Sequence, residues 1–136
     1  MNLIALKAQL VRHEGDRRLP YRDQQGNLTI GVGRDLDSKP LSDAVVRQML
    51  EEDIAEATER CLHLVPSFAG LDELRQRVLV NMSFNLGNRL HGFTQFLAAV
   101  DRRDFAAAAV EMLDSAWAKE VGARATELAQ QMEKGV

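Results

Sequence analysis

Apolar and polar positions alternate with helical spacing at the start of the chain. One face carries apolar residues three or four positions apart, namely Leu3, Leu6 and Leu10, and this spacing predicts an amphipathic helix over residues 2–13. Gly15 follows as a typical stop, because glycine readily takes the left-handed conformation that ends many helices. We therefore expect Glu14 to lie in the last turn of a short first helix.

Between residues 20 and 33 the pattern changes to short segments separated by turn residues. The run Asp23-Gln24-Gln25-Gly26-Asn27 is typical of a turn. The segment that follows it, Leu28 to Gly33, is rich in β-branched residues and glycine, which favours a strand and a second turn. We expect a small β-hairpin or a three-stranded meander here.

Helical spacing returns after Pro40. Ser42 is a good N-cap for a long helix that ends near Pro66, with an apolar side formed by Val45, Met49, Ile54 and Leu62. Further helices are expected at about residues 71–86 with Gly87 at the end, 94–100 capped by Thr94, 102–118, and 121–133. One helix, a small sheet and then a run of helices is typical of the α+β class.

Composition and charge narrow the functional classes. A length of 136 residues with 46% hydrophobic side chains suits one domain with a packed core. The 17 basic and 20 acidic residues leave a charge of −3, which argues against a nucleic-acid-binding surface. No apolar run has the length of a membrane span, and no signal peptide is recognisable at residues 1–11. The single cysteine, Cys61, excludes an internal disulfide and is expected in the core.

Three residues near the predicted sheet could act in chemistry. Glu14 lies at the negative end of a helix dipole, which disfavours its charged form and suits a general acid. Asp23 and Thr29 follow in the turn and the second strand. An exposed helix end, a turn former and a strand residue are the ordinary interpretations of the three residues taken singly. Their convergence on one small sheet favours a catalytic interpretation.

Metal and cofactor chemistry finds no support in the sequence. His13, His63 and His91 lack the spacing of metal ligands. No nucleotide-binding or other cofactor motif is present either. We expect neither a metal nor a cofactor.

Several segments together resemble the phage-type lysozymes, glycoside hydrolase family 24. The resemblance to the catalytic segment of that family rests on His13-Glu14-Gly15, Tyr21-Arg22-Asp23, Gly26 and Thr29-Ile30-Gly31-Val32-Gly33. The resemblance to its C-terminal lobe rests on Asn81-Met82-Ser83-Phe84-Asn85-Leu86-Gly87, Gly92-Phe93-Thr94, Trp117 and Arg124. The likeness runs from about residue 3 to 135, in the order of the family.

The resemblance implies a mainly helical lysozyme fold and a site. The single domain 1–136 would have a small β-containing lobe at about 13–60 and a helical lobe of about 1–12 plus 61–136, joined by the long helix. Glu14 would be the general acid of an inverting enzyme, Asp23 the carboxylate that stabilises the transition state and helps activate water, and Thr29 the hydroxyl that holds that water.

Four more residues would support that site. Arg124 would pair with the catalytic glutamate, Phe84 and Asn85 would face the saccharide, and Tyr21 would support the substrate. Arg34 stands where many relatives carry histidine, which bears on support and substrate fit and leaves the acid, base and water positions intact.

The resemblance implies a monomeric peptidoglycan hydrolase, or muramidase, that cleaves the β-1,4 bond between N-acetylmuramic acid and N-acetylglucosamine and lyses bacterial cells. A phage endolysin made in the host cytoplasm would reach the periplasmic wall through a holin pore, without inserting into the membrane. Two alternatives stay open. One is a catalytically silent glycan-binding or phage structural module of the same fold. The other is an enzyme of that fold that acts on a related polymer such as chitin, or a bacterial effector.

Overall fold

The first helix and the small sheet form as the sequence predicts. In the computed structural model, which describes residues 1–135, α1 spans Leu3–Glu14 and ends at Gly15, whose φ is +82°. The Asn2 side chain accepts a hydrogen bond from the Ala5 amide at 3.0 Å and so caps the helix start. The expected end of this helix is confirmed, and Glu14 is its last residue.

Three antiparallel strands follow in the order β1-β2-β3, with β1 at Arg17–Arg22, β2 at Leu28–Gly31 and β3 at Arg34–Asp35. Strands β1 and β2 are joined by the turn at Asp23, where the Asp23 amide donates to the Asn27 carbonyl at 3.0 Å. The register pairs Arg17 with Gly31 and Tyr21 with Thr29. The expected three-stranded meander is confirmed.

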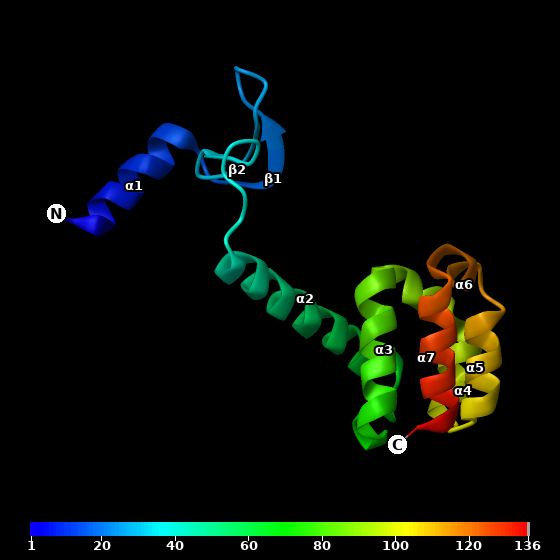
Figure 1. Cartoon of the computed structure of the whole chain (residues 1–136). Helices are drawn as coiled ribbons and strands as arrows, with labels where there is room; N and C mark the ends of the chain where they lie inside the picture. Colours follow the sequence, from blue (N-terminus) through cyan, green and yellow to red (C-terminus); the bar gives the residue numbers. More distant parts are fainter. Residues whose placement is uncertain (136) are drawn as a thin grey trace. The chain divides into compact units, whose positions relative to one another are not determined.

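The chain divides into two units, Met1–Gln48 and Met49–Val136. The first holds α1 and the sheet, and we call it the sheet unit; the second holds most of α2 and all later helices, and we call it the helical unit. Figure 1 shows the elements of each unit. The expected lobes of about 13–60 and 1–12 plus 61–136 stay a prediction.

The long helix α2 spans Asp43–Leu64 and starts where Ser42 predicts, because the Ser42 hydroxyl accepts from the Val45 amide at 3.3 Å. Its buried side chains are Ala57 and Cys61. The apolar side predicted for this helix is not its buried side. Ile54 is 43% exposed, and Val45, Met49 and Leu62 are comparably exposed. The packing of this helix therefore rests on small side chains near its end, where the Ser83 hydroxyl of the following helix donates to the Ala57 carbonyl at 2.8 Å.

The helical unit continues with α3 at Glu73–Leu86, α4 at Thr94–Asp101, α5 at Phe105–Leu113, α6 at Ala116–Val121 and α7 at Ala123–Lys134. Short 3₁₀ segments, η1 at Phe68–Gly70 and η2 at Gly87–Gly92, connect them. Helix α7 packs against both α3 and α5 (Figure 1). The core between them is made largely of Val78, Leu79, Met82, Leu90, Phe96, Val100, Met112, Trp117, Leu128 and Met132.

Two expected helix boundaries in this unit are wrong. The helix predicted over 102–118 is two helices, because the Ser115 side chain accepts from the Ala118 amide and its hydroxyl donates to the Met112 carbonyl. Thr94 does not cap α4 and is instead its first residue, with no side-chain cap at Phe93. The expected α+β class, with seven α-helices and one three-stranded sheet in residues 1–135, is confirmed.

Arg75 joins the start of α3 to the end of α7. Its Nε donates to the Met132 carbonyl at 2.7 Å and its Nη2 to the Glu133 carbonyl at 2.8 Å. These carbonyls belong to the last turn of α7, where the helix itself supplies no donors. The guanidinium also lies 3.6 Å from the centre of the Phe105 ring and pairs with Asp72 at 3.3 Å. Arg75 therefore fixes the end of α7 against α3 and α5.

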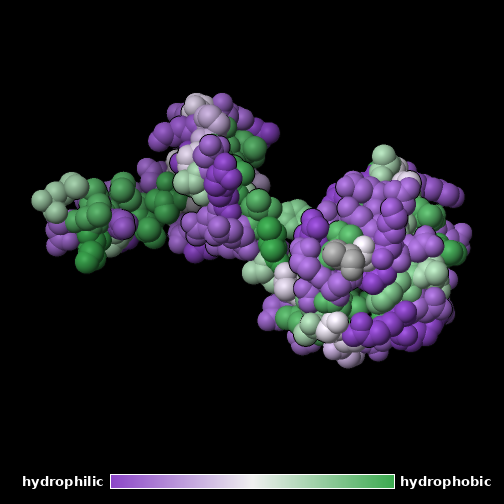
Figure 2. Space-filling view, turned by 60° about the horizontal axis from the view of Figure 1, so that its bottom comes forward, coloured by the Kyte–Doolittle hydropathy of each residue, from purple (hydrophilic) through white to green (hydrophobic). Residues whose placement is uncertain are grey.

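The surface of the helical unit combines hydrophilic and hydrophobic regions. In the space-filling view of Figure 2 the face shown of the helical unit is largely hydrophilic, with separate hydrophobic patches. Among residues 1–135, no helix combines the length and the apolarity that crossing a membrane requires.

Candidate active site

Glu14 is held at the junction of helix and sheet. The chain turns at Gly15, whose amide donates to the Val11 carbonyl at 2.9 Å, and enters β1 at Arg17. Since Arg17 pairs with Gly31 at the end of β2, the end of α1 is brought to the β2–β3 turn. The Glu14 side chain lies against Gly33 in this turn, because a Cβ added to that glycine would lie 2.7 Å from Glu14 Oε2.

Asp23 sits in the β1–β2 turn with a fixed carboxylate. Its Oδ1 accepts from the amides of Gln25 at 2.9 Å and Asn27 at 2.8 Å, which is the geometry of a turn former. Within residues 1–135 its Oδ2 makes no hydrogen bond. The ordinary turn role of Asp23 therefore coexists with a second oxygen that can face a substrate or a water.

Thr29 is the buried polar group of the sheet, with 3% of its surface exposed. Its hydroxyl donates to the Asn27 carbonyl at 2.9 Å, so the oxygen keeps its lone pairs to accept from a water. Tyr21 lies directly opposite on β1, and the Arg17 guanidinium lies 4.4 Å from the centre of its ring. The strand pairing thus positions both Thr29 and Tyr21.

The sheet unit therefore contains the three residues that the sequence singles out for chemistry. A carboxyl at a helix end, a carboxylate in a turn and a hydroxyl on a strand can together supply a proton, stabilise a positive charge and hold a water. These are the parts that hydrolysis of a glycosidic bond needs. The roles of the individual residues stay a prediction.

Arg124 lies in the first turns of α7, where Asn81 of α3 orients its guanidinium. The Asn81 Oδ1 accepts from Arg124 Nε at 3.1 Å and from Nη2 at 2.7 Å. Asn81 has no assigned role in the sequence-based site, because a contact across 43 residues leaves no local signal. The expected pairing of Arg124 with the catalytic glutamate stays a prediction.

Phe84 and Asn85 are neighbours on α3 with different environments. Phe84 is 44% exposed, so it is not a core residue and could form an apolar platform. The Asn85 Oδ1 accepts from Trp117 Nε1 at 2.8 Å. The indole therefore occupies the carbonyl side of the Asn85 amide and leaves its N–H groups as donors, while contact of either residue with saccharide stays a prediction.

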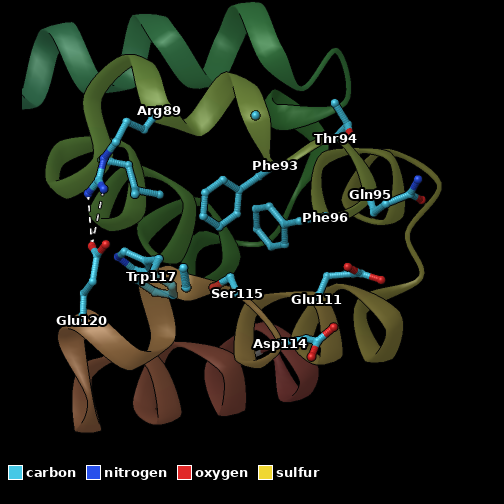
Figure 3. Close-up of a pocket in the computed structure, with 13 residues that line it drawn as sticks. Arg89, Phe93, Thr94, Gln95, Phe96, Glu111, Asp114, Ser115, Trp117 and Glu120 are labelled. Carbon is cyan, nitrogen blue, oxygen red and sulfur yellow. Dashed lines mark hydrogen bonds and ion pairs between the residues drawn. The ribbon is translucent and has the colours of Figure 1, made fainter.

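A pocket of about 300 Å³ lies in the helical unit, with Trp117 in its lining, and sequence reasoning missed it (Figure 3). Its aromatic wall is formed by Phe93, Phe96 and Trp117, and acidic side chains come from α5 and α6. Arg89 of η2 pairs with Glu120 at 3.4 Å at one end of the pocket. The lining residues come from five elements, α3, η2, α4, α5 and α6, so no single sequence motif indicates the pocket.

Metal ligands are not grouped in the described part of the chain. Within residues 1–135 no three side chains of histidine, cysteine, aspartate or glutamate lie close enough to hold a metal ion.

The α+β fold carries Glu14, Asp23 and Thr29 in its sheet unit, and comparison with known proteins gives the class of protein. The profile of the family described as phage lysozyme matches residues 11–134, and the chain belongs to this family. It is similar to two proteins of Dictyostelium discoideum called probable T4-type lysozyme 1 and 2, with 25% and 26% identity, each covering 96% of this chain and 95% of the relative. The protein is therefore a glycosidase of lysozyme type, and its family implies peptidoglycan as the substrate.

Proposed function

We propose that the protein cleaves the β-1,4 bond between N-acetylmuramic acid and N-acetylglucosamine in peptidoglycan, with inversion at the anomeric carbon. The observation that carries the proposal is the grouping in one unit of Glu14 at the β2–β3 turn, Asp23 with a fixed carboxylate, and the buried Thr29 hydroxyl. Family membership supports the substrate.

Each of the three residues has a defined role in this reaction. Glu14, in its acid form, donates a proton to the glycosidic oxygen as the bond from that oxygen to the anomeric carbon breaks. The Asp23 carboxylate stabilises the positive charge that develops on the sugar ring. Thr29 accepts a hydrogen bond from a water, which adds to the anomeric carbon on the face opposite the leaving group and gives its proton to Asp23. Proton exchange with solvent then restores Glu14 and Asp23.

The first experiment compares wild type and Glu14→Gln on purified Gram-negative peptidoglycan. We record the fall in turbidity, the new reducing ends and, by NMR, the anomer formed first. Because an amide cannot donate the proton, Glu14→Gln should lose on the order of 100-fold or more of the rate while its melting temperature is preserved. His13→Gln, on the same helix turn, is the matched control and should retain activity.

Each other outcome has a definite meaning. Activity of Glu14→Gln near the wild-type level would remove Glu14 from the mechanism, and an initial β-anomer would refute inversion. Folded wild-type protein that binds peptidoglycan without cleaving it would favour the silent glycan-binding module. Cleavage of chitin oligomers in preference to peptidoglycan would favour the related-polymer enzyme.

The proposal extends to the biological role. The protein acts as a monomeric endolysin that is made in the host cytoplasm and reaches the periplasmic wall through a holin pore to lyse the cell. Fractionation of cells that express the chain without a holin should recover it from the cytoplasmic fraction. Processed protein in the periplasm would refute this route, and a dimer mass in light scattering would refute the monomer.

A further inference from the structure

Two glycines at the β2–β3 turn have nearly the same φ but different surroundings. Gly31 has a φ of +63° and Gly33 a φ of +65°, and both values favour glycine. A methyl group added at Gly31 would meet nothing within 4 Å. A methyl group added at Gly33 would meet Glu14 at once.

The contact at Gly33 involves the whole Glu14 side chain. The added carbon would lie 2.7 Å from Glu14 Oε2, 3.1 Å from its Cδ and 3.2 Å from its Cβ. Rotation of the side chain about its Cβ–Cγ bond would clear the first two atoms. It would not clear Cβ, whose position is set by the backbone of α1. Any side chain at residue 33 must therefore displace Glu14 or the turn itself.

Nothing else in the sheet unit holds this carboxyl group. Within Met1–Gln48, Glu14 has no hydrogen-bond or ion-pair partner. The end of α1 is fixed by Gly15 and by the pairing of Arg17 with Gly31. The exposed Glu14 side chain therefore lies against bare backbone at Gly33, in the space that the Cβ of any other residue would occupy.

We infer that Gly33 is a positioning residue for Glu14, because the Glu14 carboxyl group occupies the space that a side chain at residue 33 would fill. The inference rests on the proposed function, in which Glu14 is the proton donor. A carboxyl group that is displaced from its position beside Gly33 loses its alignment with the glycosidic oxygen. Misplacements of about 1 Å reduce catalysis on the order of 100-fold.

The experiment compares Gly33→Ala with Gly31→Ala. Both substitutions force alanine to a positive φ of nearly the same value, and only Gly33→Ala adds the contact with Glu14. On soluble peptidoglycan fragments we expect kcat of Gly33→Ala to fall on the order of 100-fold with KM within about threefold of wild type. Gly31→Ala should keep kcat within about threefold of wild type.

A second measurement does not depend on turnover. The side-chain carboxyl ¹³C resonance of Glu14, assigned by its absence in Glu14→Gln, should move in Gly33→Ala and stay in place in Gly31→Ala. If Gly33→Ala does not fold, the double variant Glu14→Gly with Gly33→Ala should recover a cooperative melting transition, because all three close atoms are then gone. A double variant that stays unfolded beside a folded Glu14→Gly would overturn the inference.

The remaining outcomes separate the two claims. Equal losses of kcat in Gly31→Ala and Gly33→Ala would assign the effect to turn strain and overturn the positioning role. A Glu14 resonance that does not move in Gly33→Ala would overturn it as well. Wild-type protein without turnover, combined with a Glu14 resonance that moves only in Gly33→Ala, would refute the proposed function and support the positioning role of Gly33.

Discussion

Raising the pH above 9 should destabilise the protein through Cys61. This residue is fully buried on α2, with 0% of its surface exposed. Burial raises the pKa of the Cys61 thiol from 9.0 to about 11, against the smaller opposing effects of Ser83 and Arg60. The folded protein therefore favours the neutral thiol over the thiolate.

The sign and size of the effect follow from the two pKa values. Between pH 9 and 11 the unfolded chain has lost the Cys61 proton and the folded protein keeps it. Stability therefore falls as pH rises. The contribution is fully present below pH 9 and is lost as the pH passes 11. Each pKa unit corresponds to about 1.4 kcal/mol, so this shift predicts a loss of about 2–3 kcal/mol.

Cys61→Ala isolates this contribution because alanine does not titrate. We would measure the free energy of unfolding by urea denaturation, with reductant present, for both proteins between pH 8 and pH 11. The wild type should lose about 2–3 kcal/mol relative to Cys61→Ala across this range. A difference between the two proteins that stays constant with pH would refute the reasoning, because every other titrating group is common to both.

Three further substitutions test other contacts. Arg75→Met should cost about 2–3 kcal/mol in urea unfolding, because it frees the last carbonyls of α7. Substitution of the exposed Arg77 on the same helix, Arg77→Met, should cost less than about 0.5 kcal/mol. Equal costs would contradict the role of Arg75 in holding the end of α7. Thr29→Val should lower kcat more than it raises KM, and Thr29→Ser should restore kcat; an unchanged kcat in Thr29→Val would make Thr29 purely structural. Trp117→Ala should cost about 3–5 kcal/mol, and an unshifted melting temperature would contradict its core position.

Local signals explain what the sequence could predict. Gly15 ends α1, Ser42 starts α2, and the Asp23 turn joins β1 to β2, each by contacts within four residues along the chain. Glu14 at the end of α1 and Asp23 in the turn are fixed by such short-range contacts, so their places in these elements could be predicted from the sequence. Their roles in an active site stay a prediction.

Long-range contacts explain what the sequence could not predict. Trp117 binds Asn85 across 32 residues and Arg124 binds Asn81 across 43. Neither contact has a local pattern. Ser115 is a different case, because the alanine-rich segment before it favours one continuous helix. Its side chain nevertheless bonds the backbone on both sides and starts a new helix.

Synthesis runs from the sheet unit to the helical unit, and α7 is the last helix to be made. Within residues 1–135 every buried apolar side chain belongs to the helical unit, so the whole sheet unit has been synthesised before any part of the hydrophobic core can form. That core lacks one wall until Leu128 and Met132 of α7 arrive. Until then the sides of α3 and α5 that pack against α7 stay exposed. Chaperones, and aggregation in crowded cells, should therefore act on those two helices before translation ends.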